Sequence, residues 1–300
     1  MDQTGDQQKN SNGPRKVTVN DIRSMKEKGE KITALTSYDL STATFCDKSG
    51  VDIVLVGDSA GMVMLGYKNT VPVNMEEMLL FTKAVCHGTK RAFVTADMPF
   101  GSYQINNNLA VENAIRLIKT GCDSVKLEGG KEVADTVSAI VKKGIPVMGH
   151  IGLKPQTSAL WEGYKVQGKT KDSALKLISD ARALEDAGAF SIVLEMVTSE
   201  VAKIITEDVS VPTIGIGSGF ACDGQVLVIH DMLGIYENMK PRFVKRYLEL
   251  SSLIPDAITR YIVDVKSSKF PEEQNIFHMV PDEYLLLQQT LKETDNEKQK

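Results

Sequence analysis

Short apolar segments recur along the chain, and each is followed by a turn and a longer stretch with helical spacing. These segments are rich in β-branched residues, which is typical of buried strands. They lie at residues 31–37, 52–58, 91–97, 123–129, 145–151, 190–196, 211–217 and 225–231. Because strands alternate with helical stretches, the pattern predicts a parallel sheet with helices packed on it.

The number of these units favours a closed barrel over an open sheet. Eight strand segments, apolar on both faces, fit a single (β/α)8 TIM-type barrel. Helices are expected at 74–88, 108–121, 132–144 and 173–188, with closing helices at 243–265. The first four of these stretches each end in a glycine, the residue expected just past a helix. The predicted fold class is therefore α/β.

The barrel is expected to occupy residues 17–280 as the catalytic domain. A short helix capped by Thr18 or Asn20 is expected at its start. Residues 1–16 are polar and lack the apolar core of a signal peptide, so they are interpreted as a disordered leader of a cytoplasmic protein. Residues 281–300 become polar and charged, which indicates a frayed helix or a disordered tail.

Composition and charge narrow the classes of function. The 300 residues are 42% hydrophobic with a net charge of −4, so a soluble globular protein with a sizeable core is expected. There is no basic footprint for nucleic acid and no apolar stretch long enough to cross a membrane. The four cysteines lie far apart without a C-x-x-C pair, so neither a zinc site nor a disulfide is indicated. Small-molecule substrates and other subunits are the expected partners.

Polar side chains stand at the ends of five consecutive predicted strands, where a barrel of this class builds its active site. They are Asp58 with Ser59, Asp97, Lys126 with Glu128, His150, and Glu195. Asp58 alone could equally be a helix cap, and Lys126 with Glu128 could be a structural ion pair. Taken together, however, so many side chains that are costly to bury predict a functional site.

Three of these side chains, Asp58, Asp97 and Glu128, are carboxylates on adjacent strands. Such oxygen ligands suit Mg²⁺, which keeps water or substrate oxygens in its remaining positions. The ion could bind a 2-oxo acid and stabilise the negative charge of enolisation. Lys126 would then face the substrate carboxylate, and Glu195, its pKa raised by apolar neighbours, would remove the proton.

Two further features carry less weight. His150 is interpreted as an orienting residue, because a lone histidine at a strand end more often supports other groups than reacts. The segment GIGSGF at 215–220 has Phe220 in place of the third glycine of a dinucleotide-binding loop, so no such cofactor is predicted.

Nine segments of the chain carry a family resemblance. They are LVGDSAGMVMLGY, TADMPFGSY, VKLEGG, GHIGLKPQ, GYKVQGK, VLEMV, IGIGSG, DGQVLVIHDMLG and FPEEQNIFHM. In this order, over residues 17–279, they resemble the ketopantoate hydroxymethyltransferase family. The resemblance implies a (β/α)8 barrel, Mg²⁺ and a homo-oligomer, typically a decamer. It also implies transfer of a hydroxymethyl group from 5,10-methylenetetrahydrofolate to 3-methyl-2-oxobutanoate, giving 2-dehydropantoate through a Mg-stabilised enolate in pantothenate biosynthesis.

The resemblance also assigns roles to residues. Carried over by motif, the metal ligands would be Asp58, Asp97 and Glu128. The residues that hold the oxo acid would be Asp58, Ser59, Asp97 and Lys126. The proton acceptor would be Glu195. These are the residues that strand-end placement indicates without the family.

Three other interpretations stay open. A Mg-dependent carbon-carbon lyase or mutase of the phosphoenolpyruvate type, acting on another 2-oxo acid, would use a similar barrel, but the usual K-K-C-G-H loop is absent. A Schiff-base aldolase would use Lys126, but the adjacent carboxylates would raise the pKa of that lysine and weaken it as a nucleophile. A barrel kept as a binding or assembly scaffold would show no turnover.

Overall fold

The computed structural model describes residues 15–157, 164–237 and 241–298. The chain divides after Leu248 into two compact units. The leader expected at 1–16 falls, except for its last two residues, outside the described residues.

The first unit contains a closed barrel of parallel strands. In the described part of the chain the strands are β1 (Ile32–Thr36), β2 (Ile53–Val56), β3 (Phe93–Asp97), β4 (Ser124–Glu128), β5 (Val147–Gly152), β6 (Ser191–Glu195), β7 (Thr213–Ile216) and β8 (Gly224–Leu227). They are hydrogen-bonded in chain order, and β1 pairs with β8 to close the barrel. The (β/α)8 fold is confirmed, and each strand overlaps the segment predicted for it.

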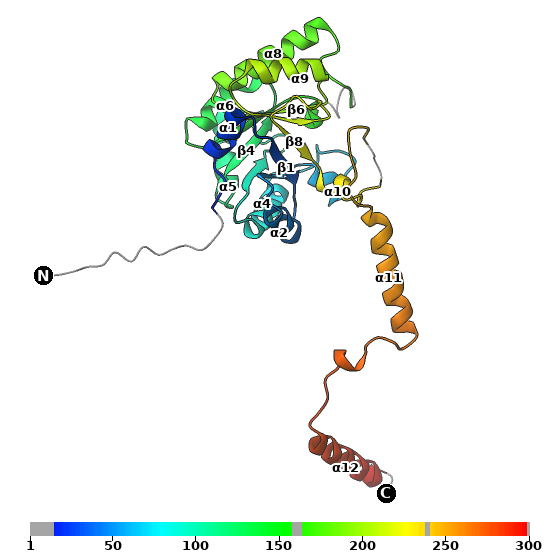
Figure 1. The fold of residues 1–300 in the computed structure, drawn as a ribbon. Helices are drawn as coiled ribbons and strands as arrows, with labels where there is room; N and C mark the ends of the chain where they lie inside the picture. Colours follow the sequence, from blue (N-terminus) through cyan, green and yellow to red (C-terminus); the bar gives the residue numbers. More distant parts are fainter. Residues whose placement is uncertain (1–14, 158–163, 238–240, 299–300) are drawn as a thin grey trace, which may run out of the picture. The chain divides into compact units, whose positions relative to one another are not determined.

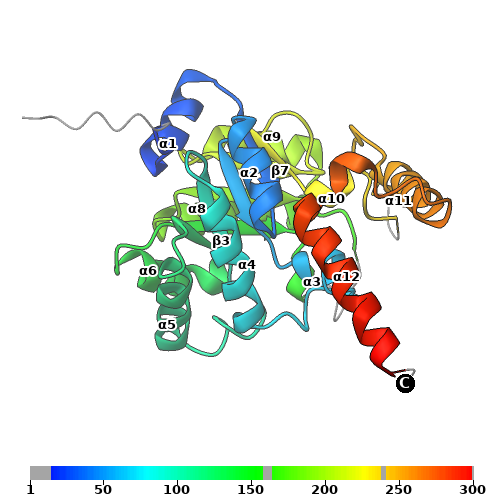
Figure 2. The same cartoon turned by 90° about the horizontal axis from the view of Figure 1, so that it is seen from below.

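Helices surround the strands (Figures 1 and 2). Those described in the first unit are α1 (Val19–Lys28), α2 (Leu40–Lys48), α3 (Ala60–Val63), α4 (Met75–Gly88), α5 (Asn107–Ile118), the 3₁₀ turn η1 (Lys131–Val133), α6 (Ala134–Val141), α8 (Lys171–Asp186), α9 (Ser199–Asp208) and α10 (Ile229–Met232). The side chain of Thr18, not Asn20, caps α1, and Gly29 ends it with a φ of 71°. These local signals explain why the helix bounds agree with the sequence pattern.

One predicted strand is too long. The segment 225–231 was expected to be a strand throughout, but β8 ends at Leu227 and α10 begins at Ile229. The backbone N–H of Ile229 donates to the Thr36 side-chain hydroxyl at 3.0 Å. The chain therefore leaves the strand ladder at the rim of the barrel, and its apolar residues continue into a short helix.

The second unit starts at Glu249. It contains α11 (Leu250–Lys266), the 3₁₀ turn η2 (Glu273–Asn275) and α12 (Pro281–Lys298). This division differs from the domain boundary expected at residue 280, and the assignment of residues 249–280 to the barrel domain stays a prediction. None of the described helices is long and apolar enough to cross a membrane.

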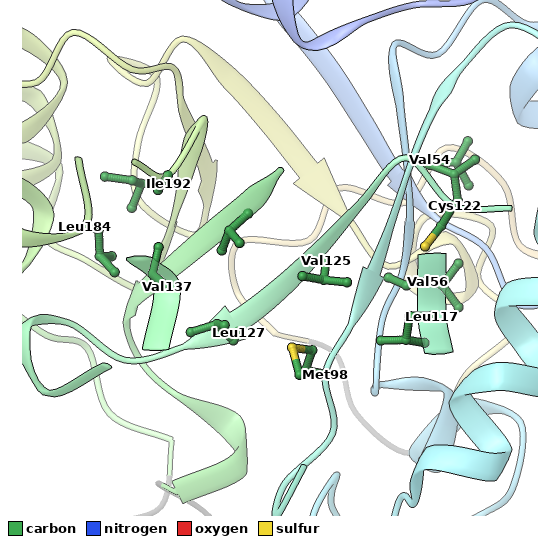
Figure 3. Close-up of a cluster of buried hydrophobic side chains, with 14 of the residues drawn as sticks. Val54, Val56, Met98, Leu117, Cys122, Val125, Leu127, Val137, Leu184 and Ile192 are labelled. Atoms are coloured by element: carbon green, nitrogen blue, oxygen red, sulfur yellow. The ribbon is translucent and has the colours of Figure 1, made fainter. Parts of the chain in front are cut away.

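Outward-facing residues of the strands pack against the helices. Val54 and Val56 of β2 and Val125 and Leu127 of β4 lie in one apolar cluster with helical residues such as Leu117 (Figure 3). Every second residue of a strand faces the same side, so the residues between them must face the barrel interior. This packing fixes Lys126 and Glu128 on the inner face, as their spacing predicted.

The interior of the barrel changes from apolar to polar along the strands. An inner apolar cluster includes Phe93, Met148 and Phe190, and the rings of Phe93 and Phe190 lie 5.4 Å apart. One step further along the strands, the Ser124 hydroxyl donates to the Thr95 hydroxyl at 2.8 Å. The strand ends beyond this point carry ionisable groups. The inner apolar cluster therefore lies beneath a polar site at one end of the barrel.

Candidate active site

The residues singled out at the strand ends come together around one cavity of about 1550 Å³. Asp58, Ser59, Asp97, Lys126, Glu128, His150 and Glu195 all line it. Their positions follow from the parallel barrel, in which the carboxyl ends of all strands meet at the same rim. The structure therefore brings together every residue that the sequence placed in the site.

Lys126 and Asp97 form a buried ion pair across two neighbouring strands. The two residues are register partners of β3 and β4, and Lys126 Nζ lies 3.1 Å from Asp97 Oδ1. Burial by itself would lower the pKa of Lys126, but Asp97, Glu128 and Asp58 together raise it above the usual value. The side chain is therefore a fixed ammonium and a poor amine nucleophile.

Asp58 is a buried carboxylate next to this pair. Its backbone N–H donates to Asp97 Oδ2 at 3.1 Å, and its Oδ2 accepts a hydrogen bond from Gln156 Nε2 at 2.9 Å. The helix that follows is capped at Ser59 without a side-chain hydrogen bond, so Asp58 does not act as its cap. Burial, followed by the charge of Asp97, raises the pKa of Asp58 to about 7.

Ser59 is held by a tyrosine from the end of β1. The hydroxyls of Ser59 and Tyr38 lie 2.8 Å apart, and Tyr38 is 1% exposed. A Cβ at Gly57 would lie 2.7 Å from the Ser59 hydroxyl, so a larger residue there would displace that hydroxyl. The Ser59 hydroxyl is thus fixed at the rim beside Asp58.

Glu128 is the last residue of β4 and is buried beside His150, its register partner on β5. Its side chain is 2% exposed, and its Oε2 accepts a hydrogen bond from the backbone N–H of Gln156 at 3.1 Å. Burial, with a further contribution from Asp58, raises the pKa of Glu128 well above its usual value. Clustered acids of this kind favour a cation between them, because each ionised carboxylate raises the cost of ionising the next.

Glu195 is the carboxylate that reaches into the cavity. Its side chain is 17% exposed, and its Oε2 lies 3.3 Å from His150 Nε2. Burial raises the pKa of Glu195 to about 7, against the opposing charge of Lys126. A general base is most effective when its pKa lies near the working pH, so this environment suits proton abstraction.

The backbone around Glu195 is unusually constrained. A Cβ at Gly152 would lie 2.2 Å from the Glu195 carbonyl oxygen, so only glycine allows β5 and β6 to meet there. The next residue, Met196, has a φ of 48°, which costs a non-glycine residue about 1–2 kcal/mol. The chain bends immediately after Glu195, where β6 ends.

The donor set fits Mg²⁺ in chemistry and charge, but the carboxylates do not form a closed cage. Within the described ranges, no group of three or more His, Cys, Asp or Glu side chains is placed to hold a metal. Mg²⁺ usually takes only one or two carboxylates and fills its other positions with water or substrate. The backbone N–H of Asp58 donates to Asp97 Oδ2 at 3.1 Å, and the charge of Lys126 opposes the negative charge of the two carboxylates. A third ligand at Glu128 stays a prediction.

Three residues of the site were not found from the sequence. Tyr38 follows β1 directly, so the rule that placed Asp58 at a strand end could also have found it. Tyr103 and Gln156 lie in the loops after β3 and β5, and their hydroxyl and amide oxygen lie 2.8 Å apart. No spacing in the sequence indicates that these two loops meet.

The chain is similar in sequence to known proteins over most of its length. A model of the ketopantoate hydroxymethyltransferase family matches residues 16–273. The chain is 56% identical over 274 residues to the 3-methyl-2-oxobutanoate hydroxymethyltransferase of Nitrosopumilus maritimus, covering 91% of this chain and 98% of that protein. It is 56% identical over 268 residues to the enzyme of the same name from Carboxydothermus hydrogenoformans, covering 89% and 97%.

Similarity of fold extends further than similarity of sequence. The crystal structure of a phosphonopyruvate hydrolase aligns with a TM-score of 0.58 at 11% identity, covering 93% of this chain and 97% of that one. At this identity the likeness shows the barrel fold alone. The family match spans most of the chain, and the relatives align over nearly their whole length. The chain therefore belongs to the ketopantoate hydroxymethyltransferase family, enzymes that transfer a hydroxymethyl group, as its motifs indicated.

Proposed function

We propose that the chain transfers a hydroxymethyl group from 5,10-methylenetetrahydrofolate to 3-methyl-2-oxobutanoate, giving 2-dehydropantoate for pantothenate biosynthesis. The observation that carries this proposal is the placement of Glu195, a cavity-facing base, beside a buried group of carboxylates and Lys126. Relatives that are 56% identical bear the name of this activity, which supports the same substrate.

Asp58, Asp97 and Glu128 would hold Mg²⁺ at the rim. When bound, the ion would supply positive charge where the keto oxygen of the substrate becomes negative. The Lys126 ammonium would attract the substrate carboxylate and oppose the remaining negative charge of the cluster. The Ser59 hydroxyl, fixed by Tyr38, would donate a hydrogen bond to the same acid.

Glu195 would take the proton from C3 of the oxo acid and leave an enolate. His150 would orient it: burial and the charge of Lys126 lower the pKa of His150 well below its usual value, so the ring is neutral. Its Nδ1 lies 3.2 Å from Lys126 Nζ and must act as the acceptor, which leaves the proton on Nε2, facing Glu195. The ring would thus limit the positions of the base by contact, since Nε2 lies 3.3 Å from Glu195 Oε2 without a hydrogen bond to it.

The enolate carbon would then bond to the methylene carbon of the folate. Water supplies the oxygen of the new hydroxyl group, and tetrahydrofolate leaves. A cavity of about 1550 Å³ is much larger than a five-carbon oxo acid requires, since sites for drug-sized ligands occupy about 300–1,000 Å³. The additional space supports a second, larger substrate.

The direct test is formation of 2-dehydropantoate by the full chain with both substrates and Mg²⁺, followed by mass spectrometry. We expect product in the complete mixture, no product without the folate, and loss of product in EDTA that is restored by excess Mg²⁺. Absence of product in the complete mixture would overturn the proposal. Product that persists in EDTA would overturn the metal part alone.

Two other enzyme classes would give different results in assays with a 2-oxo acid. A lyase or mutase of the phosphoenolpyruvate type would convert another 2-oxo acid without folate, and the solved structures of that kind support it only at the level of fold. A Schiff-base aldolase would be trapped on Lys126 by borohydride with 3-methyl-2-oxobutanoate. We expect no covalent adduct, because the neighbouring carboxylates keep the amine protonated.

The assembly and location of the protein remain predictions. The family resemblance implies a homo-oligomer, a decamer. The polar leader and the composition predict a cytoplasmic protein with small molecules, and no nucleic acid or membrane, as partners. Light scattering coupled to size-exclusion chromatography would measure the number of subunits directly.

A further inference from the structure

A single glutamine connects the two loops above the site to the acidic cluster. Gln156 is 1% exposed, and its Nε2 donates to Asp58 Oδ2 and to the Met98 carbonyl oxygen, both at 2.9 Å. Its backbone N–H donates to Glu128 Oε2 at 3.1 Å. One residue therefore contacts two of the carboxylates, which come from different strands, through two different groups.

The orientation of this amide is determined by its surroundings. A backbone carbonyl oxygen can only accept hydrogen bonds, so the end of Gln156 that faces the Met98 carbonyl, and with it Asp58, must be the NH₂ group. The amide oxygen then lies 2.8 Å from the Tyr103 hydroxyl, which can donate to it. The same hydroxyl accepts the backbone N–H of Glu128 at 3.1 Å.

These contacts form a closed network around the acids. It runs from the Glu128 backbone through Tyr103 to the Gln156 amide and on to Asp58, while the Gln156 backbone returns to the Glu128 side chain. Tyr103 is 2% exposed, so the network is shielded from water. Buried networks that are fully satisfied hold their members in one arrangement.

We propose that Gln156 is a positioning residue, oriented by Tyr103, that holds the carboxylates of Asp58 and Glu128 in the arrangement needed to bind the metal ion. This inference rests on the proposed function, because it assigns those carboxylates to the ion. The amide occupies Oδ2 of Asp58 and limits rotation of the carboxylate. Partners of this kind set the geometry of metal ligands, and their loss typically weakens metal binding about 10- to 100-fold.

The test measures Mn²⁺ binding to the full chain by electron paramagnetic resonance, without substrates. Gln156→Met keeps the length of the side chain and removes both the donor and the acceptor. We expect its Kd for Mn²⁺ to rise about 10- to 100-fold relative to the parent. Gln289→Met is the matched control, because Gln289 is exposed on α12 and is not a member of this network. Its Kd should match the parent.

A second variant separates positioning from folding. Tyr103→Phe leaves Gln156 in place and removes the hydroxyl that orients it, so we expect Kd to rise about 2- to 10-fold, the equivalent of one hydrogen bond. If Gln156→Met does not fold, as near-ultraviolet circular dichroism would show, Tyr103→Phe decides the question. A purely structural role would lower the melting temperature of the metal-free protein and leave Kd unchanged in the folded variants.

The outcomes separate this inference from the proposed function. The positioning role is overturned if folded Gln156→Met binds Mn²⁺ as tightly as the parent. If that variant does not fold, the same result in folded Tyr103→Phe overturns it. Either result holds even when the parent makes 2-dehydropantoate. Weakened binding in the variants supports the role, even when the parent makes no product. A parent that binds no Mn²⁺ overturns both the role and the metal site.

Discussion

His150 Nε2 lies 3.3 Å from Glu195 Oε2, while Nδ1 of the same ring lies 3.2 Å from Lys126 Nζ. The imidazole thus spans the distance between the buried cation and the carboxylate that reaches the cavity. Because His150 is buried and its pKa is lowered, the ring stays neutral and can accept at one nitrogen and donate at the other. The proposed base is therefore connected to the acidic cluster through one oriented side chain.

The first prediction concerns proton removal. Exchange of the C3 proton of 3-methyl-2-oxobutanoate in D₂O, followed by NMR without folate, should require Mg²⁺ and fall about 10²- to 10⁴-fold in Glu195→Gln, the usual effect of losing a general base. Glu200→Gln is the control, because Glu200 lies on the exposed side of α9. If Glu195→Gln exchanges the C3 proton as fast as the parent, another group is the base.

The second prediction is the pH dependence of the same exchange. The pKa of Glu195 is raised to about 7, and only the ionised form can accept a proton. The rate should increase about tenfold per pH unit below 7 and level off above it. A rate that is constant from pH 5 to 8 would mean that the group is already ionised and that burial does not control its charge.

The stability of the folded protein should fall as the pH rises, whereas the exchange rate should increase. The folded protein keeps a proton on Glu195 up to about pH 7, whereas the unfolded chain releases it near 4.5. This group therefore stabilises the fold below its usual pKa, and that contribution is lost as the pH rises through about 7. The melting temperature of the metal-free protein should fall from pH 5 to 8, and the melting temperature of the Glu195→Gln variant should fall less over the same range. An equal fall in both would exclude Glu195 as a contributor.

The third prediction addresses the orienting role of His150. His150→Gln should slow C3 exchange about tenfold, because the ring lies 3.3 Å from Glu195 Oε2 and limits the positions of that carboxylate without a hydrogen bond to it, and losing such a contact is worth about 1 kcal/mol. His87→Gln is the matched control, since His87 is exposed in the last turn of α4. A loss in His150→Gln as large as that of Glu195→Gln would mean that the histidine reacts directly.

The fourth prediction concerns the layer between the strands and the helices. Leu117 on α5 is fully buried in the outer cluster, so Leu117→Ala should lower the free energy of unfolding by about 2–5 kcal/mol. Leu80→Ala on α4 is the control, because Leu80 is 68% exposed and its loss should change stability by less than about 0.5 kcal/mol. Denaturant titration of both variants would measure the difference.

The sequence by itself determined the barrel and most of the site. Apolar segments separated by helical stretches admit few folds, and in a parallel barrel every strand ends at the same rim. Asp97 and Lys126 could therefore be placed together from their positions at strand ends, without knowledge of any contact. The same reasoning failed at 225–231, because apolar residues alone do not distinguish the end of a strand from a short helix.

Only the tertiary structure decided how the loops complete the site. Gln156 and Tyr103 belong to different loops, and their contact with Asp58 and Glu128 depends on the path of each loop over the rim. The close approach of Gly152 to the Glu195 backbone and the left-handed φ of Met196 likewise appear only in the folded chain. Periodicity determines which face of a strand a residue occupies, but hydrogen bonds between distant loops form only after the barrel has closed.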